Sequence, residues 1–466
     1  MKTSLPVSRI QWPLAALLLA CALVLGGGQG TPGDALCQAL ATALIALTLW
    51  RNASEPAARL PPVAWFALLP LLLPAMQLLP IPDGLWQSGP ARAELAAQLA
   101  SVGLAHSSPL SIDPTGTQRA LFWMLPAVAL FLAGLQFRAG QRYGLVAIFA
   151  AVSVFAMLLG ISQLAGGLDS KLRFYEITNY ANAVGFFANS NHHASLMAMA
   201  LPLVLVGTAA WVNHRSAADT DARSRTPLLW WLLGGGVVVA LMLGIALARS
   251  RAGMGLGVLG LLLSVPAVLA LRRDRGTVRL LLVGAAVAAA LIVQFALFGI
   301  VQRIEQGVGD DARREYAALT VELAGEYAPL GSGLGSFRRA FEGFDREAPV
   351  DGVYVNHAHN DPAELWLEAG WALPVVLLPL LAAFAMAGWK AWRGVPGPTP
   401  AMLGLRRAAW IALLLVLLHS LVDYPLRTTA HLAVFGLLAA FLVSGPRRQL
   451  PTTAPGAAQP EVPHAT

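Results

Sequence analysis

The chain alternates long apolar runs with shorter polar connections, a pattern that is typical of a polytopic membrane protein. A membrane-spanning helix needs about 20 predominantly apolar residues, and twelve stretches come close to that requirement. These stretches lie at residues 12–28, 34–50, 61–79, 118–137, 143–165, 192–212, 227–248, 252–271, 279–300, 365–389, 405–422 and 428–444. We therefore predict an all-α membrane protein with about twelve transmembrane helices.

The positions of basic side chains predict which ends of these helices face the cytoplasm, because Lys and Arg concentrate there in short loops. With a cytoplasmic N-terminus, 19 of the 32 Lys and Arg residues fall on inner segments. Six of the other 13 lie in one long loop, residues 301–362, where the rule has little force. We predict that both termini are cytoplasmic and that this large loop, between the ninth and tenth helices, is extracytoplasmic.

One transmembrane domain, residues 1–445, is expected to make up almost the whole chain. Residues 446–466 are rich in Pro, Ala and Thr, and we expect a disordered cytoplasmic tail there. Two segments of the outer loops, "ARAELAAQLASVGL" after Pro90 and "DDARREYAALTVELAGEY" from Asp310, have the pattern of surface helices.

Composition supports the membrane class, since 56% of the residues are hydrophobic and only 12% are charged, with a mean hydropathy of +0.62. These values lie well outside the range of soluble domains. The net charge of +7 says less than the side on which the basic residues fall, and it does not indicate a nucleic-acid partner. Cys21 and Cys37 lie in apolar stretches, where a thiol packs as a small hydrophobic group.

Polar residues gather in "NHAHNDPAELWLEAG", residues 356–370, at the start of the tenth apolar stretch. Asp361, Pro362 and Glu364 fit a helix start, with Asp361 as N-cap, Pro at the first helical position and Glu364 closing a capping box. His359 and Asn360 then precede the helix beside its positive dipole end, which favours anions.

The same stretch carries candidates for proton transfer. Histidine accepts a proton from a hydroxyl group near neutral pH, although His357 and His359 also fit a pair of solvated loop histidines. Glu368 is predicted two turns into the helix, where a carboxylate is costly unless it is paired or functional. No third ligand has the spacing of a metal site, so we expect no metal.

A second cluster, "ARSRAG" at residues 248–253, places Arg249 and Arg251 on the outer side, where basic residues are disfavoured. Arginine binds phosphate oxygens bidentately, so a lipid diphosphate is one interpretation, and contact with lipid headgroups is the other. Arg313 and Arg314 in the outer loop are further candidates on the same side.

Two more polar stretches are predicted to face outward. "NYANAVGFFANSNHHASL" places Asn191 with two histidines at a helix start, and "HSLVDYPLR" places Asp423 between His419 and Arg427. We expect an Asp423–Arg427 pair that closes a turn.

Five motifs in this order resemble the O-antigen ligase and polymerase superfamily of bacterial inner-membrane glycosyltransferases, over about residues 150–430. They are "ANSNHHASLMAMALPL", "ARSRAGMGLGVLGLLL", "PLGSGLGSF", "AHNDPAELWLEAGW" and "HSLVDYPLR". The resemblance implies a multi-pass protein of the inner membrane whose periplasmic face binds a glycan linked to undecaprenyl diphosphate. It also implies transfer without a metal, a nucleotide sugar or another cofactor.

Within that resemblance, the His-Asn before the helix corresponds to His359 and Asn360, and the E-x-G to Glu368 and Gly370. The arginine after a serine corresponds to Arg251, and the loop arginine to Arg313 or Arg314. His359 is then expected to act as general base on an acceptor hydroxyl, with the arginines stabilising the departing diphosphate and the anomeric carbon inverting.

The motifs do not separate several acceptors. A ligase transfers the glycan to lipid A core, a polymerase to a growing glycan, and a related branch to protein hydroxyl groups. A twelve-helix secondary transporter is an alternative of a different class, but transporters place ionisable groups near the membrane midplane. Here the polar groups gather at one outer face, which favours the glycosyltransferases.

Overall fold

The computed structural model describes residues 8–28, 30–104, 109–218, 226–271, 309–344, 355–394 and 398–444, together with a few positions between 277 and 293. The described part of the chain is helical and contains no β-strand. Its α-helices are α1 (Ser8–Leu25), α2 (Pro32–Ser54), α3 (Leu69–Gln77), α4 (Asp83–Trp86), α5 (Pro90–Ser101), α6 (Pro114–Trp123), α7 (Leu125–Gln136), α8 (Ala139–Ala165), α9 (Ser190–Ala218), α10 (Thr226–Leu247), α11 (Arg251–Leu271), α13 (Gly309–Glu326), α14 (Phe337–Phe344), α15 (Asp361–Ala369), α16 (Ala372–Arg393), α17 (Pro400–His419) and α18 (Thr429–Val443). The 3₁₀ segments are η1 (Pro56–Ala58), η2 (Pro62–Leu68) and η3 (Pro425–Arg427).

Eight of the described helical stretches are long and apolar enough to cross a membrane. They are α2, the α6–α7 pair, α8, α9, α10, α11, α16 and α17, and three shorter apolar helices lie at the other predicted spans 12–28, 61–79 and 428–444. Most of the predicted span 279–300 and all of the tail 446–466 fall outside the described residues. The all-helical class is thus confirmed, whereas the number twelve stays a prediction.

The predicted span 365–389 is wrong in one respect, because two helices occupy it. α15 ends at Ala369 and α16 begins at Ala372, and Gly370 between them has φ 55°. A Cβ atom on Gly370 would lie 2.3 Å from the Pro329 carbonyl oxygen, so the chain turns where only glycine fits. Hydropathy does not reveal this break, because the chain stays apolar after Trp371. The break keeps the polar helix α15 outside the spanning segments.

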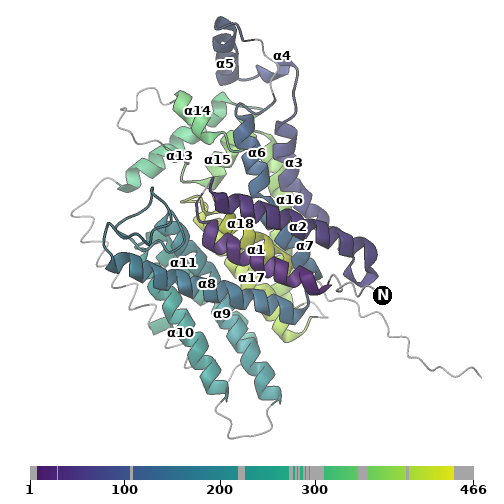
Figure 1. Ribbon diagram of the computed structural model, residues 1–466, viewed down its shortest axis with the longest axis vertical. Coiled ribbons are helices and arrows are strands. Elements are labelled where there is room, and N and C mark those ends of the chain that lie inside the picture. Colours follow the sequence, from purple (N-terminus) through teal and green to yellow (C-terminus); the bar gives the residue numbers. More distant parts are fainter. Residues whose placement is uncertain are drawn as a thin grey trace, which may run out of the picture.

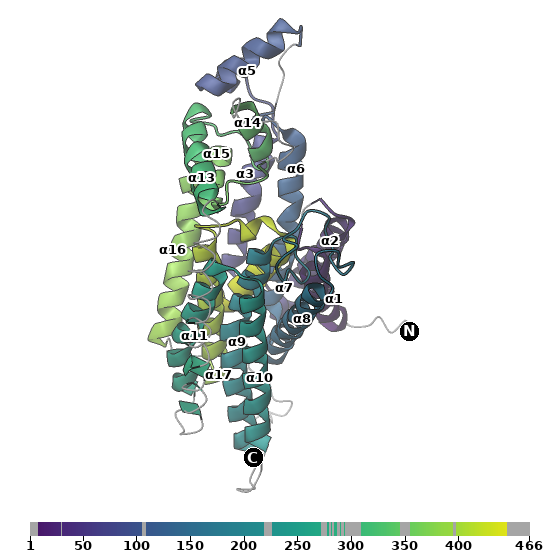
Figure 2. The ribbon, with the colours of Figure 1, turned by 90° about the vertical axis from the view of Figure 1, so that its left-hand side faces the viewer.

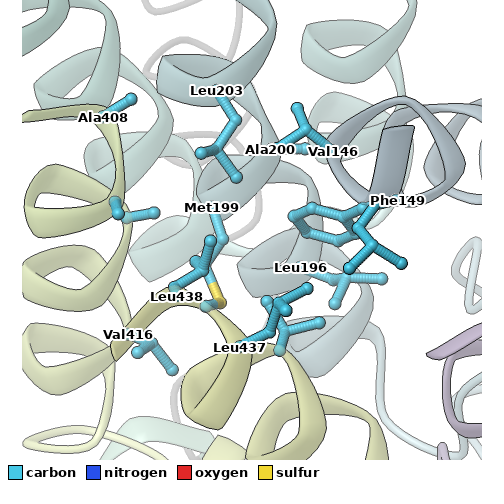
Figure 3. Packing of buried hydrophobic residues seen from close by; sticks show 14 of the residues in the cluster. Val146, Phe149, Leu196, Met199, Ala200, Leu203, Ala408, Val416, Leu437 and Leu438 are labelled. Atoms are coloured by element: carbon cyan, nitrogen blue, oxygen red, sulfur yellow. The ribbon is translucent and has the colours of Figure 1, made fainter. Parts of the chain in front are cut away.

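Helix α9 is the centre of the bundle. Helices α8, α10, α11 and α17 surround it (Figures 1 and 2). Of an apolar 18-residue stretch of α9, 83% is buried inside the protein. Figure 3 shows Leu196 and Met199 of α9 near Phe149 of α8 and near Leu437 and Leu438 of α18. The polar N-terminus of α9 therefore lies at the end of the bundle that is predicted to face outward, called the outer end below.

Close packing of α7 on α18 depends on small residues, as is common between membrane helices. A Cβ atom on Gly436 would lie 2.1 Å from the Ala127 carbonyl oxygen, and one on Gly134 would lie 2.8 Å from the Ala440 Cβ atom. This contact fixes the start of α18 and the polar connection before it.

Helices α13, α14 and α15 lie beyond the outer end of the bundle, with α5 farther out (Figure 2). They share a small core of their own that includes Leu323, Phe337, Phe341 and Leu367. The surface helices predicted after Pro90 and from Asp310 are confirmed as α5 and α13.

Replacing Gly370 with alanine is expected to lower the free energy of unfolding by about 1–3 kcal/mol, the typical cost of a strained backbone conformation. The added Cβ atom also clashes with Pro329. The thermal midpoint in detergent measures the effect. Gly84→Ala is the matched control, because no atom lies within 4 Å of its new Cβ, and equal midpoints for the two variants would contradict the assignment.

Candidate active site

Two cavities open at the outer end of the bundle. The smaller one, of about 650 Å³, is called the arginine cavity after Arg249, Arg251, Arg313 and Arg314 in its lining. The larger one, of about 950 Å³, is called the carboxylate cavity, because five Asp and Glu residues line it. Segments from α6, α9, α11, α13, α15 and the α17–α18 connection contribute to their walls.

Eight of the ten predicted site residues line the arginine cavity. They are Asn191, Arg249, Arg251, Arg313, Arg314, His359, Asn360 and Asp423. The other two, His357 and Glu368, line the carboxylate cavity instead. The structure therefore brings the predicted base and the predicted arginines together and does not bring Glu368 beside His359.

The arginines reach this cavity from two directions. Arg249 and Arg251 lie at the start of α11, and Arg313 and Arg314 lie in the first turns of α13. Arg249 has φ 52° and His359 has φ 51°, and these two are the described non-glycine residues with positive φ. Such strained residues concentrate at functional sites, and both of these line the same cavity.

Asp423 contacts four side chains at the arginine cavity. Its Oδ2 accepts a hydrogen bond from Asn191 Nδ2 at 2.5 Å and lies 3.8 Å from Arg313 Nη1. Its Oδ1 lies 3.5 Å from both His359 Nδ1 and His192 Nε2. One buried carboxylate thus links side chains from α9, α13 and the segment before α15.

The charge of Asp423 is favoured by these neighbours. Burial alone would raise the pKa of its carboxyl group, but His192 and His359 hold that pKa well below its usual range. An ionised carboxylate beside an imidazole fixes the ring and stabilises its protonated form. Asp423 can therefore orient the His359 ring.

The expected pairing of Asp423 with Arg427 is wrong, because Arg427 bonds to α15. Its Nη1 lies 2.8 Å from Glu368 Oε2 and 3.5 Å from Glu364 Oε1, and its Nε donates to Asp361 Oδ1 at 3.4 Å. Asp361, Glu364 and Glu368 recur every three or four residues, so they share one face of the helix. Arg427 is the largely buried cation that holds these three carboxylates together.

The ionisation of the three carboxylates differs. Burial raises the pKa of Asp361 to about 6, and it also raises the pKa of Glu368 despite the charge of Arg427. Burial would raise the pKa of Glu364 as well, but Arg427 and His357 lower it below its usual value. Glu368 Oε1 also accepts a hydrogen bond from Gly335 N at 2.8 Å. Glu368 is therefore bound into the structure, tying α15 to the loop before α14.

The N-cap of α15 lies one residue before the predicted Asp361, and the predicted capping box with Glu364 is wrong. Asn360 is the N-cap and accepts a hydrogen bond from Ala363 N, so Asp361 occupies the first helical position. Glu364 accepts from Ala358 N at 3.0 Å and bonds His357 Nδ1 at 2.8 Å. The carboxyl group of Glu364 thus fixes the backbone just before His359.

Two residues missing from the predicted set contribute to the site. One is His192, the first of the two histidines after Asn191, whose Nε2 lies 3.5 Å from Asp423 Oδ1. The Tyr424 ring lies 4.1 Å from that of His357, 4.8 Å from that of His192 and 4.9 Å from that of His359, measured between centroids. An Asp-Tyr pair in a polar connection is the only sequence signal for this role. Among the described residues no group of three His, Cys, Asp or Glu side chains has the arrangement of a metal site.

Comparison with known proteins agrees with this geometry. The family model described as O-antigen ligase matches residues 235–378. This match confirms the resemblance to the O-antigen ligase superfamily. The matched segment includes Arg251, Arg313, His359 and Glu368, whereas Asn191 and Asp423 lie outside it. No curated protein matches the chain.

Proposed function

We propose that this protein is a membrane glycosyltransferase of the O-antigen ligase type. It moves a glycan from undecaprenyl diphosphate to an acceptor hydroxyl group on the periplasmic face of the bacterial inner membrane. One observation carries the proposal: four arginines surround His359 and its partner Asp423 in one cavity, and the O-antigen ligase match covers all of these residues except Asp423.

The proposed reaction is a single displacement. His359 takes the proton of the acceptor hydroxyl group, and the acceptor oxygen forms a bond to the anomeric carbon of the glycan. The bond from that carbon to the diphosphate oxygen breaks, and the electron pair leaves with the diphosphate. Arg249, Arg251, Arg313 and Arg314 are positioned to stabilise this anion. Attack opposite the leaving group inverts the anomeric carbon, and no metal is required.

The proposed orientation follows from the helix ends. Both cavities lie at the ends of helices opposite to those that carry Arg51, Arg142, Arg215 and Arg393. Because basic residues favour the cytoplasmic side, the cavities face the periplasm and both termini face the cytoplasm. A donor on a membrane lipid then reaches the arginine cavity from the outer leaflet.

Deletion of the gene and complementation test the function and the acceptor. If the protein is a ligase, lipopolysaccharide from the deletion strain carries no polymer on its lipid A core. A band of a single repeat in its place assigns the polymerase reaction. Unchanged lipopolysaccharide and secreted polysaccharide in the deletion strain would contradict the proposal.

Replacing Arg251 with alanine is expected to lower the rate of transfer about 100-fold, since loss of one group that stabilises a developing anion has effects of this size. The measurement is transfer from purified lipid-linked donor by the protein in detergent. Arg138→Ala, a variant of an exposed arginine at the start of α8, is the control. Equal rates in both variants would remove Arg251 from the site.

A further inference from the structure

The two cavities share a thin wall that three chain segments build. In each segment, residues one or two positions apart line opposite cavities. Asn191 lines the arginine cavity and His192 the carboxylate cavity; the same holds for His359 and His357, and for Asp423 and Tyr424. His359 and His192 each lie 3.5 Å from the same Asp423 oxygen, one on either side. A group in either cavity is therefore close to Asp423 and its histidines.

The two linings differ in charge. Four arginines and the single carboxylate of Asp423 line the arginine cavity. The carboxylate cavity combines five Asp and Glu residues with four arginines. At its floor Glu364 and Glu368 are almost fully buried, and Arg427 bridges them. A diphosphate is attracted to the first cavity, whereas the second gives no net preference for an anion.

The carboxylate cavity is also rich in aromatic rings. Trp123, Phe174, Tyr175 and Phe337 line it together with Tyr424, while no Phe, Tyr or Trp is among the described residues that line the arginine cavity. Rings present apolar faces, and carboxylates, amides and guanidinium groups accept from or donate to hydroxyl groups. This combination fits a hydroxyl-rich ligand with apolar C–H faces, and about 950 Å³ is at the upper end of the range of small-molecule sites.

We propose that the carboxylate cavity binds the sugar portion of the acceptor, an oligosaccharide whose reactive hydroxyl group reaches across the wall to His359. This inference rests on the proposed glycan transfer and adds the place and the chemical class of the second substrate. Donor diphosphate and acceptor sugar then approach Asp423 from opposite sides. Separate cavities also keep the donor from occupying the acceptor position.

Photo-crosslinking tests binding independently of catalysis. Ile177 lines the rim of the carboxylate cavity and is 75% exposed, and Ala317 lines the arginine cavity. With p-benzoylphenylalanine at position 177, we expect crosslinks to rough lipopolysaccharide, a lipid A core without polymer, or to an undecaprenyl-diphosphate-linked glycan that serves as acceptor. Position 371, exposed on the outer side and lining neither cavity, is the control.

Competition separates the roles of the two cavities and the two sources of acceptor. With p-benzoylphenylalanine at position 317 instead, we expect crosslinks to the donor. Excess unlabelled acceptor oligosaccharide freed of its lipid should remove the crosslink at 177 and leave the donor crosslink at 317. The probe that is captured at 177, rough lipopolysaccharide or the lipid-linked glycan, identifies the source. A crosslink at 177 that persists in excess acceptor oligosaccharide, or equal capture at 177 and 371, would overturn the proposal.

Steady-state kinetics give a second readout. Trp123→Ala is expected to raise the KM for acceptor about tenfold, or ~1.4 kcal/mol of binding, and to leave the KM for donor unchanged. Trp371→Ala is the matched control, and Glu342→Gln replaces Trp123→Ala if the latter does not fold. A rise in the donor KM alone would overturn the acceptor assignment. An absence of any transfer by the wild-type protein would instead count against the proposed function, and the crosslinks would still report on the cavity.

Discussion

Replacing His359 with asparagine is expected to lower the rate of glycan transfer at least ~100-fold, because loss of a general base has effects of 10²–10⁴. Asparagine is the preferred replacement because it keeps the backbone conformation of this position. His359 has φ 51°, and asparagine tolerates this conformation better than other non-glycine residues. The variant therefore keeps the backbone of the segment and removes only the imidazole.

The pattern of kinetic constants distinguishes a base from a structural residue. Loss of a base lowers kcat and leaves the KM for donor unchanged, because the arginines that hold the diphosphate remain. Asp423→Asn is expected to act in the same direction, since it removes the carboxylate that lies 3.5 Å from His359 Nδ1 and orients the ring. His214→Ala, which changes an exposed histidine at the opposite end of α9, is the control. Wild-type kcat in His359→Asn would remove His359 from the reaction.

Eight of the residues that line the arginine cavity could be predicted from the sequence because their types are unusual where they occur. Outward-facing arginines at the start of α11 and histidines before α15 stand out against apolar helices. Each such residue is at a helix start, so its depth in the membrane could be predicted from hydropathy alone. That Arg251 and His359 line one cavity followed only from the resemblance, because contacts between distant segments are not encoded in local patterns.

The position of Glu368 shows where such reasoning fails. Its spacing from Asp361 and Glu364 predicts one carboxylate face on α15, but not the partner of that face. The partner is Arg427, 59 residues later. The sequence pattern instead indicated a pairing of Arg427 with Asp423, which is closer in the chain. The break at Gly370 was also hidden, because hydropathy continues from α15 into α16 while the close approach of Pro329 depends on tertiary packing.

Replacing Arg427 with glutamine is expected to destabilise the protein by about 3–5 kcal/mol, the usual cost of removing one partner from a buried ion pair. Three buried carboxylates on α15 lose their common cation, and the loop held by Glu368 loses its support. The thermal midpoint in detergent is the measurement. Arg338→Gln, which breaks the exposed Arg338–Glu342 pair, is the matched control and should leave the midpoint unchanged, because exposed pairs add little stability.

The pH dependence of this variant has a definite sign. In the wild-type protein burial already raises the pKa of Asp361 to about 6 and also raises the pKa of Glu368, and Arg427 opposes both shifts. Without Arg427 these pKa values rise further, so between the unfolded values near 4 and the raised folded values the folded state binds more protons than the unfolded state. Stability then falls as pH increases. We expect the midpoint of Arg427→Gln to approach that of the wild type at pH 5 and to fall farthest below it at pH 8; a deficit that is equal at both pH values would show that the three carboxylates are not coupled through Arg427.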